Sequence, residues 1–203
     1  VPEPEIKDSD TVVGLDFGIT DIVCTSEGRT YSSDALNEYR EKRLKICGSI
    51  QSKGTRGCKK LLKRLSGREK TTATIINHAI SKQIVSDAKE RGIGLAIEDL
   101  SKIRQTAKRR NKTFRSKLNR WNFGQLRAFL TYKCALSGVR LVVVEPSYTS
   151  QTCSHCHHIG IRNGKSFKCT NCGNDMDADI NAARNIALLG VGSDDHTFVN
   201  GAL

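Results

Sequence analysis

The 203-residue sequence has no run of about 18 consecutive apolar residues and no N-terminal signal pattern, which excludes a membrane-spanning helix and predicts a cytoplasmic protein without a membrane partner. Aromatic residues are also scarce, at 5% of the chain. Phe114, Trp121 and Phe123 lie in or just after a basic segment, where they are candidates for stacking on nucleic-acid bases, although core packing is the favoured role for Phe123. A chain of this length suffices for one core domain and a small satellite.

Positive charge is in excess, since 33 Lys and Arg residues stand against 21 Asp and Glu residues. Residues 37–70 hold twelve basic residues and three acids, and residues 101–120 hold nine basic residues and no acid. Two basic segments on an otherwise acidic body are typical of a nucleic-acid-binding protein, although two solvated helix faces would give the same counts. The second segment supplies the predicted nucleic-acid-binding residues Lys102, Arg104, Lys108, Arg109, Arg110, Lys112, Arg115, Lys117 and Arg120.

Four of the eight cysteines form two Cys-x2-Cys pairs separated by twelve residues: Cys153, Cys156, Cys169 and Cys172. Each pair places two thiolates on one tight turn, and four thiolates match the tetrahedral coordination that Zn²⁺ prefers. The sequence therefore predicts a ribbon with one structural zinc ion, which provides most of the folding free energy of so small a unit. A site that mixes cysteines with His155, His157 or His158 is the minor alternative.

The apolar periodicity predicts a mixed α/β domain. Three short strands at the start suggest an antiparallel meander, and later strands alternate with helices. The last helix should bury Ala182, Ala183, Ile186 and Leu189 on one side. The expected strands are 11–17, 22–26, 28–32, 93–97 and 139–144, and the expected helices are 34–91 with a break at 48–57, 122–137 and 179–189.

Several acids lie at the ends of apolar elements. Asp16 ends the first strand, Glu98 and Asp99 follow the strand at 93–97, and Asp177 and Asp179 precede the last helix. Taken singly, each is explained as a turn or helix-capping residue. Taken together, they suggest a metal site in which two divalent ions activate a water and stabilise the leaving oxygen of a phosphodiester.

Four short segments carry the most distinctive residues: 12–18 (VVGLDFG), 97–100 (IEDL), 146–156 (PSYTSQTCSHC) and 177–186 (DADINAARNI). They resemble the signatures of TnpB, a family of insertion-sequence (OrfB-type) proteins ancestral to the type V CRISPR effector nucleases. The resemblance runs from about residue 11 to residue 189, which is nearly the whole chain.

The resemblance implies an RNase H-like (RuvC) mixed sheet with flanking helices and an inserted four-cysteine zinc ribbon. It places the catalytic, Mg²⁺-binding acids at Asp16, Glu98 and Asp179, because the family's last catalytic aspartate stands two residues before the Asn at position 181. It further implies an endodeoxyribonuclease that needs two Mg²⁺ or Mn²⁺ ions, acts on DNA under the direction of a guide RNA in a prokaryotic or phage-type host, and leaves a 5′-phosphate and a 3′-hydroxyl.

The residue patterns and the resemblance together divide the chain into parts. Residues 1–10 would be a linker or boundary remnant, 11–148 the nuclease core with a basic helical insertion at about 37–70, and 149–175 the zinc ribbon that contacts target nucleic acid. Residues 176–190 would complete the core and 191–203 form a tail. The family's N-terminal half, which binds the guide RNA, has no counterpart here, so we expect a missing N-terminal half or a partner to hold the guide.

Two other functions fit parts of the sequence. A non-catalytic zinc-ribbon module would use the basic segments for nucleic-acid binding alone, but acids beside a polyanion repel its phosphates unless metal ions intervene. A strand-transfer transposase would share the metal chemistry, but no separate domain for joining DNA ends is evident. The metal-dependent DNA endonuclease is therefore the favoured interpretation.

Overall fold

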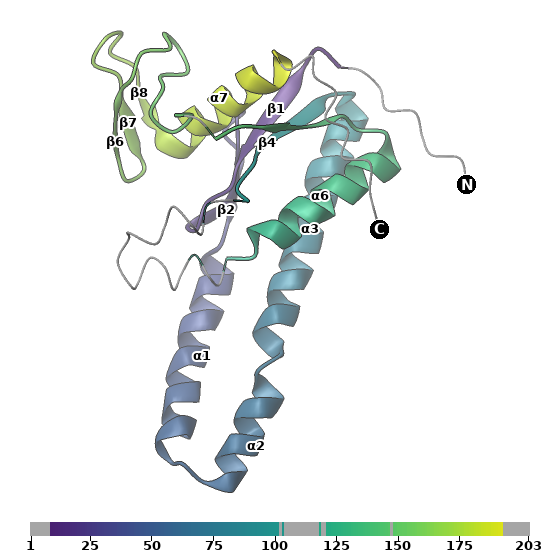
Figure 1. Ribbon diagram of the computed structural model, residues 1–203, viewed down its shortest axis with the longest axis vertical. Helices are drawn as coiled ribbons and strands as arrows, with labels where there is room; N and C mark the ends of the chain where they lie inside the picture. Colours follow the sequence, from purple (N-terminus) through teal and green to yellow (C-terminus); the bar gives the residue numbers. More distant parts are fainter. Residues whose placement is uncertain (1–8, 102, 104–117, 119–120, 147, 193–203) are drawn as a thin grey trace.

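The computed structural model describes residues 9–101, 103, 118, 121–146 and 148–192. A five-stranded sheet forms the centre of the molecule, with helices on both of its faces (Figure 1). The predicted α/β class with a mixed sheet, flanking helices and a four-cysteine unit is confirmed. In the ranges given above, no helix combines the length and apolar character needed to cross a membrane.

The strands of the central sheet lie in the order β3-β2-β1-β4-β5. β1 (Val12–Asp16), β2 (Asp21–Thr25) and β3 (Thr30–Ser32) form the predicted antiparallel meander. β4 (Gly94–Glu98) and β5 (Leu141–Val144) run parallel to β1, and helices make the long crossovers that parallel pairing requires. β1 is therefore the strand at which antiparallel pairing changes to parallel pairing.

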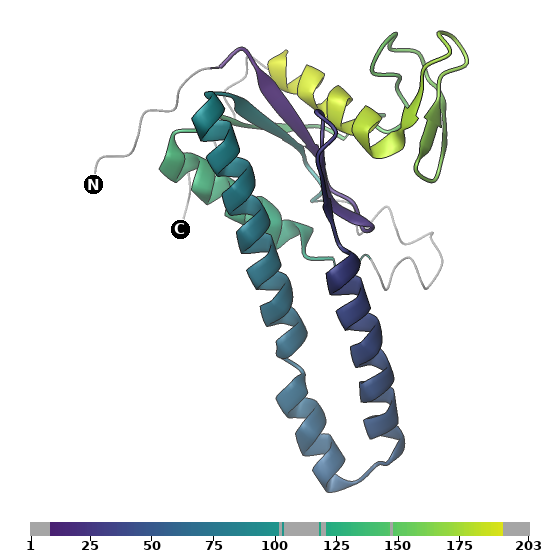
Figure 2. The same cartoon turned by 180° about the vertical axis from the view of Figure 1, so that it is seen from behind.

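Alternate side chains of β1 belong to two different cores. Val13 and Leu15 pack in the larger core with residues of α3 (Arg68–Arg91) and α6 (Phe123–Ser137). Val12 packs on the other face with Ile186 of α7 (Ala178–Val191). Figures 1 and 2 show α7 on the opposite side of the strands from α3 and α6.

Helix α7 approaches the sheet closely because glycines stand on both sides of the contact. A Cβ atom built on Gly14 would lie 2.0 Å from the carbonyl oxygen of Ala183, and one built on Gly190 would lie 2.6 Å from Cβ of Ala96. Ala182, Ala183 and Ile186 are buried as predicted, but the prediction for Leu189 is wrong, because that side chain is 44% exposed. Gly190 continues the buried side instead, since a bulky residue has no room there.

The first basic segment folds into two antiparallel helices that project from the sheet (Figure 1). They are α1 (Asp34–Ser52) and α2 (Arg56–Leu65). The predicted break is narrower than expected, because α1 continues through Gly48 and the chain turns at residues 53–55. Gly54 adopts a φ of +64°, which only glycine takes readily. α3 follows directly and ends at residue 91 as predicted, with Gly92 after it in the left-handed conformation.

The cysteine-containing segment forms a second, smaller sheet of three antiparallel strands. These are β6 (Ile161–Asn163), β7 (Ser166–Lys168) and β8 (Asp175–Asp177). Phe167 is fully buried with two of the cysteines and Ala178 in a small core of its own. β8 leads directly into α7, so this unit is joined to the central sheet without a linker.

Candidate metal centres

Asp16 and Glu98 end two neighbouring parallel strands. β1 and β4 pair with Leu15 opposite Ile97, the residues that precede the two acids. The carboxyl ends of parallel strands meet at one edge of a sheet, which is where α/β proteins place their functional side chains. Both carboxyl groups therefore lie at this edge, which we call the acidic edge.

Helix α7 brings two further acids to the acidic edge by packing on β1. The carboxylate of Asp177 accepts hydrogen bonds from the backbone N–H groups of Asp179, at 2.8 Å, and Ile180, at 3.1 Å. This is an ordinary capping role at a helix N-terminus. The Asp179 carboxylate is not used in this way, because it accepts a hydrogen bond from outside the helix, from Arg162.

Asp16 is the most strongly perturbed of these acids. Burial raises its pKa to about 7 from 3.8, with further contributions from the charges of Glu98 and Asp179, while Arg162 lowers it. Burial also raises the pKa of Glu98, against a hydrogen bond that its carboxylate accepts from the Thr149 hydroxyl. A buried carboxyl whose pKa is raised by burial and by neighbouring carboxylates, as that of Asp16 is, is poorly stabilised as a free anion, so the acidic edge favours a bound cation.

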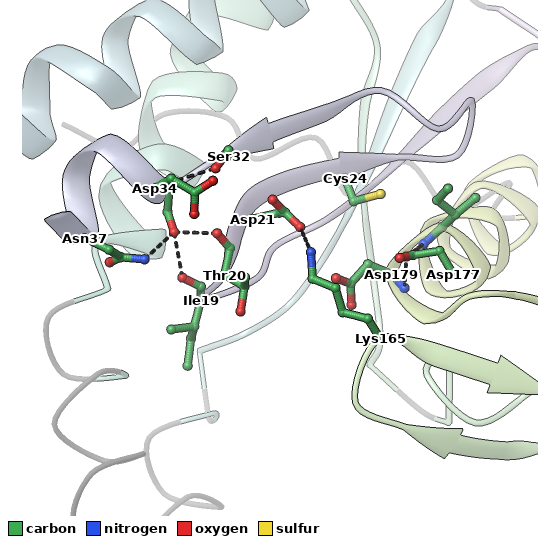
Figure 3. Close-up of polar contacts among 12 residues, drawn as sticks. Ile19, Thr20, Asp21, Cys24, Ser32, Asp34, Asn37, Lys165, Asp177 and Asp179 are labelled. Atoms are coloured by element: carbon green, nitrogen blue, oxygen red, sulfur yellow. Dashed lines mark hydrogen bonds and ion pairs between the residues drawn. The ribbon is translucent and has the colours of Figure 1, made fainter.

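Two basic residues of the small sheet reach the acidic edge. Arg162 Nη2 donates to Asp179 Oδ1 at 2.6 Å, and Lys165 forms an ion pair with Asp21 at the start of β2. Figure 3 shows the Lys165 ammonium directed at Asp21, with Asp179 and Cys24 nearby. The first contact joins β6 to α7, and the second joins the turn between β6 and β7 to β2 of the central sheet.

The four predicted zinc ligands are brought together by the small sheet. The sulfur atoms of Cys153, Cys156, Cys169 and Cys172 all lie within 4.8 Å of one another. Two of the Sγ–Sγ distances are 3.7 Å, between Cys153 and Cys172, and 3.5 Å, between Cys156 and Cys169. Zn–S bonds of about 2.3 Å at tetrahedral angles give separations of about 3.8 Å. The donor set therefore fits a metal such as zinc.

Among the described residues, no other group of three or more His, Cys, Asp or Glu ligand atoms lies as close together. His155, His157 and His158 are exposed and stand outside the cysteine group, which does not support the mixed Cys/His alternative. The carboxylates of Asp16, Glu98 and Asp179, predicted to bind Mg²⁺, do not all lie within 4.8 Å of one another, and their assignment stays a prediction. Their all-oxygen donor set is nevertheless of the kind that Mg²⁺ and Mn²⁺ bind.

Two buried asparagines of α7 connect the cysteine unit to the acidic edge. Asn181 accepts a hydrogen bond from the backbone N–H of Ser154 and donates to the carbonyl of Thr152, at 2.9 and 2.7 Å. Asn185 donates to the carbonyls of Thr149 and Thr152, both at 2.7 Å. The residue whose hydroxyl binds Glu98 is thus fixed by the same helix that carries Asp179.

Sequence reasoning missed four residues of this site, namely Asp21, Thr149, Arg162 and Lys165. Asp21 follows Asp16 by five residues across a tight turn, which was a usable signal because the next antiparallel strand begins there. Thr149 lies in the distinctive segment 146–156, but that pattern alone does not indicate a contact with Glu98. Arg162 and Lys165 are far from Asp16 in sequence, and no local pattern distinguishes them from surface residues.

The predicted nucleic-acid contacts have different outcomes. The nine basic residues at 102–120 lie outside the described residues, as does Phe114. The stacking role for Trp121 is wrong, because its side chain is 7% exposed and packs on Phe123 with ring centroids 4.9 Å apart. The core role favoured for Phe123 agrees with its packing against the larger core.

The sequence is similar to known proteins over most of its length. Residues 123–186 match the family model "Cas12f1-like, TNB domain". A TnpB-like protein of Methanocaldococcus jannaschii is 34% identical over 167 residues, which cover 81% of this chain and 60% of that protein. The CRISPR-associated endodeoxyribonuclease Cas12f1 of Sulfoacidibacillus thermotolerans is 31% identical over 207 residues, which cover 92% of this chain and 47% of that protein. The chain thus spans about half the length of these relatives.

Solved structures share the fold. A CRISPR–Cas12f ternary complex superposes with a TM-score of 0.73 at 20% identity, covering 92% of this chain and 40% of that chain. A Cas12f1–sgRNA–target DNA complex superposes with a TM-score of 0.68 at 19% identity, covering 91% of this chain and 51% of that chain. At these identities the likeness establishes the fold.

Proposed function

Because the chain is a relative of the TnpB and Cas12f proteins, we propose that it is the catalytic part of an RNA-guided DNA endonuclease of a transposon or CRISPR system. The observation that carries the proposal is the acidic edge. There, burial and neighbouring carboxylates raise the pKa of Asp16 to about 7. A protein that only bound nucleic acid would gain nothing from acids that repel phosphate and one another.

In this proposal Asp16, Glu98 and Asp179 hold Mg²⁺ or Mn²⁺, two ions in all, and the four cysteines hold one zinc ion. Divalent ions at the acidic edge would supply an activated water and stabilisation of the leaving oxygen of a phosphodiester. The zinc would be structural, since sulfur fills all four of its positions.

The chain's own residues position this chemistry. The hydroxyl of Thr149 orients the carboxylate of Glu98, and the packing of α7 on β1 sets Asp179 beside Asp16. Arg162 neutralises Asp179 while the acids hold no ion. The same guanidinium offers a positive group beside the acidic edge, where the phosphates of a DNA strand would pass.

The partners of this chain are then DNA as substrate and a guide RNA. Support comes from the relatives: one is named a CRISPR-associated endodeoxyribonuclease, and a structural neighbour is a complex with sgRNA and target DNA. We place the cut strand between the acidic edge and the β6–β7 hairpin, with guide binding shared with the part of the relatives that this chain does not span.

Cleavage of end-labelled single-stranded DNA in Mg²⁺ or Mn²⁺ tests the proposal. Asp16→Asn and Glu98→Gln should each lower the rate at least about a hundredfold, because each removes a metal ligand. Asp99→Asn is the matched control, since Asp99 neighbours Glu98 in sequence but its carboxylate pairs with Arg127 of α6 at 2.5 Å. DNA binding should persist in all three variants.

Metal binding gives a second readout that does not depend on a guide. Mg²⁺ should raise the unfolding temperature of the native chain and of Asp99→Asn, because the ion binds only the folded state. It should have little effect on Asp16→Asn or Glu98→Gln. Mg²⁺-dependent cleavage or stabilisation that survives both substitutions would contradict the proposed ligands.

A further inference from the structure

Tyr148, between β5 and β6, is the most exposed aromatic residue in the described part of the chain. It is 69% exposed, and Tyr132 of α6 follows at 40%. The other Phe, Tyr and Trp residues of that part are buried or half-buried. Tyr132 lies edge-on to Phe129 with ring centroids 6.0 Å apart, whereas the side chain of Tyr148 makes no hydrogen bond or ring contact with any described residue. The ring of Tyr148 therefore contributes little to the packing of the fold.

The backbone of Tyr148 is held in a conformation that its side chain disfavours. Its φ is +58°, in the left-handed region that glycine and asparagine adopt more readily than a bulky residue. The carbonyl of Tyr148 accepts hydrogen bonds from the backbone N–H groups of Gln151 and Thr152, both at 2.9 Å, and from the Thr152 hydroxyl at 3.0 Å. A large side chain kept in a strained position without a packing role is typical of a functional residue.

The next residue places Tyr148 at the acidic edge. The hydroxyl of Thr149 donates to the Glu98 carboxylate, and its carbonyl accepts a hydrogen bond from Asn185 of α7 at 2.7 Å. Adjacent Cα atoms are about 3.8 Å apart, which is close to the spacing of about 3.4 Å between successive phosphates of a DNA strand. Tyr148 therefore stands within about two nucleotides of a phosphate that reaches Glu98.

The chemistry of the side chain indicates the kind of ligand. Arg162 and Lys165 place positive groups at the same edge, but such groups contact the phosphates of any strand. An exposed aromatic ring instead stacks on the face of an unpaired base. In a duplex that face is covered by the neighbouring base pairs. The combination suits a single-stranded segment, with its phosphates toward the basic residues and one base on the ring.

We propose that the ring of Tyr148 stacks on an unpaired base next to the phosphate that is cut, an inference that rests on the proposed function. The stack fixes the strand at the acidic edge through a base as well as through its phosphates. Because every base has a π face, this contact holds the strand in place without selecting its sequence.

Three variants separate the ring from the fold. Tyr148→Asn removes the ring and suits the left-handed backbone, so its unfolding temperature should equal or exceed that of the native chain. Tyr148→Phe keeps the ring and loses only the hydroxyl. Tyr132→Gln is the matched control, because it removes the other exposed tyrosine from a helix that lies on the opposite side of the strands from α7 (Figure 1).

The test compares two labelled strands of about eight nucleotides by fluorescence anisotropy, with the full chain near 0.1 M salt and without divalent ions, so that neither strand is cut. One strand is oligo(dT), and the other is an abasic strand with the same number of phosphates. The ratio of the two affinities measures the contribution of the bases. All nucleotides within each strand are alike, so the ratio does not depend on which of them lies at the acidic edge.

We expect Tyr148→Asn to bind oligo(dT) at least about fivefold more weakly and the abasic strand as the native chain does. Tyr148→Phe and Tyr132→Gln should bind both strands as the native chain does. The inference is overturned by an unchanged affinity of Tyr148→Asn for oligo(dT), by an equal loss for both strands, by an equal loss in Tyr148→Phe, or by a lower unfolding temperature of Tyr148→Asn. Because the readout is binding without divalent ions, its failure is distinguishable from a failure of Asp16-dependent cleavage.

Discussion

Replacing Asp16 by Asn should make the metal-free protein more stable, although it removes the central acid of the site. Burial and the charges of Glu98 and Asp179 raise the pKa of this carboxyl from 3.8 to about 7. The folded state therefore holds the proton more tightly than the unfolded state does. The contribution of Asp16 to stability is greatest below pH 4, falls as the pH rises to 7, and is constant above that.

The size of this effect follows from the shift. A shift of about 3 units at about 1.4 kcal/mol per unit destabilises the metal-free folded state by about 4 kcal/mol above pH 7. Asn does not ionise, so the Asp16→Asn variant does not carry this destabilisation. The difference in unfolding free energy between Asp16→Asn and the native chain should widen by about 3 kcal/mol from pH 5 to pH 8. In a chain of this length that corresponds to roughly 6–12 °C in unfolding temperature.

Urea unfolding of both proteins at the two pH values, without Mg²⁺ or Mn²⁺, measures this difference. Asp99→Asn is the control, and its change in the free energy of unfolding should have the opposite sign. Hydrogen bonds from Ser101 and the nearby Arg127 lower the pKa of Asp99, so the ionised carboxylate stabilises the folded state. Saturating Mg²⁺ should narrow the gap for Asp16→Asn by stabilising the native chain alone. A variant no more stable than the native chain at pH 8, or a gap that does not change with pH, would refute the reasoning.

Two further predictions concern the framework of the site. Gly14→Ala should lower the free energy of unfolding in urea by about 3 kcal/mol, because the added Cβ would lie 2.0 Å from a backbone oxygen of α7. Gly124→Ala is the control and should not destabilise the protein, because there is open space around Gly124. A decrease below about 1 kcal/mol for Gly14→Ala would contradict the close packing. Cys153→Ser should lose the one bound zinc, measured by a colorimetric release assay, and its small sheet should unfold while the central sheet persists. Cys58→Ser is the control and should retain the metal. Stoichiometric zinc in Cys153→Ser would contradict the assignment of the zinc ligands.

The fold was largely predictable because its signals are local. Short apolar runs predicted β1, β2, β4 and β5 of the central sheet, and Gly92 and Gly138 stand at the ends of two predicted helices in the left-handed conformation. The cysteine spacing predicted the sulfur cluster for the same reason, since each pair lies within one turn. Leu189 was misplaced because periodicity alone does not reveal that α7 approaches the sheet too closely for a large side chain.

The contacts across the acidic edge were not predictable in this way. Lys165 and Asp21 are 144 residues apart, and their pairing depends on the path of the whole chain. Trp121 follows a stretch rich in Lys and Arg, which suggested a nucleic-acid contact, yet tertiary packing buries it. Composition indicates which residues favour a nucleic acid, but the fold decides which of them reach it.

The order of the acids along the chain has a consequence for synthesis. Asp16 lies in β1, and Asp179 lies in the helix that closes the other face of the same strand, 163 residues later. At roughly 5–20 residues per second, a ribosome needs roughly 8–33 seconds to make the second after the first. Throughout that interval the growing chain lacks both a covered sheet face and a complete set of acids. A message broken before this helix therefore yields a fragment with one face of β1 uncovered and an incomplete acidic edge.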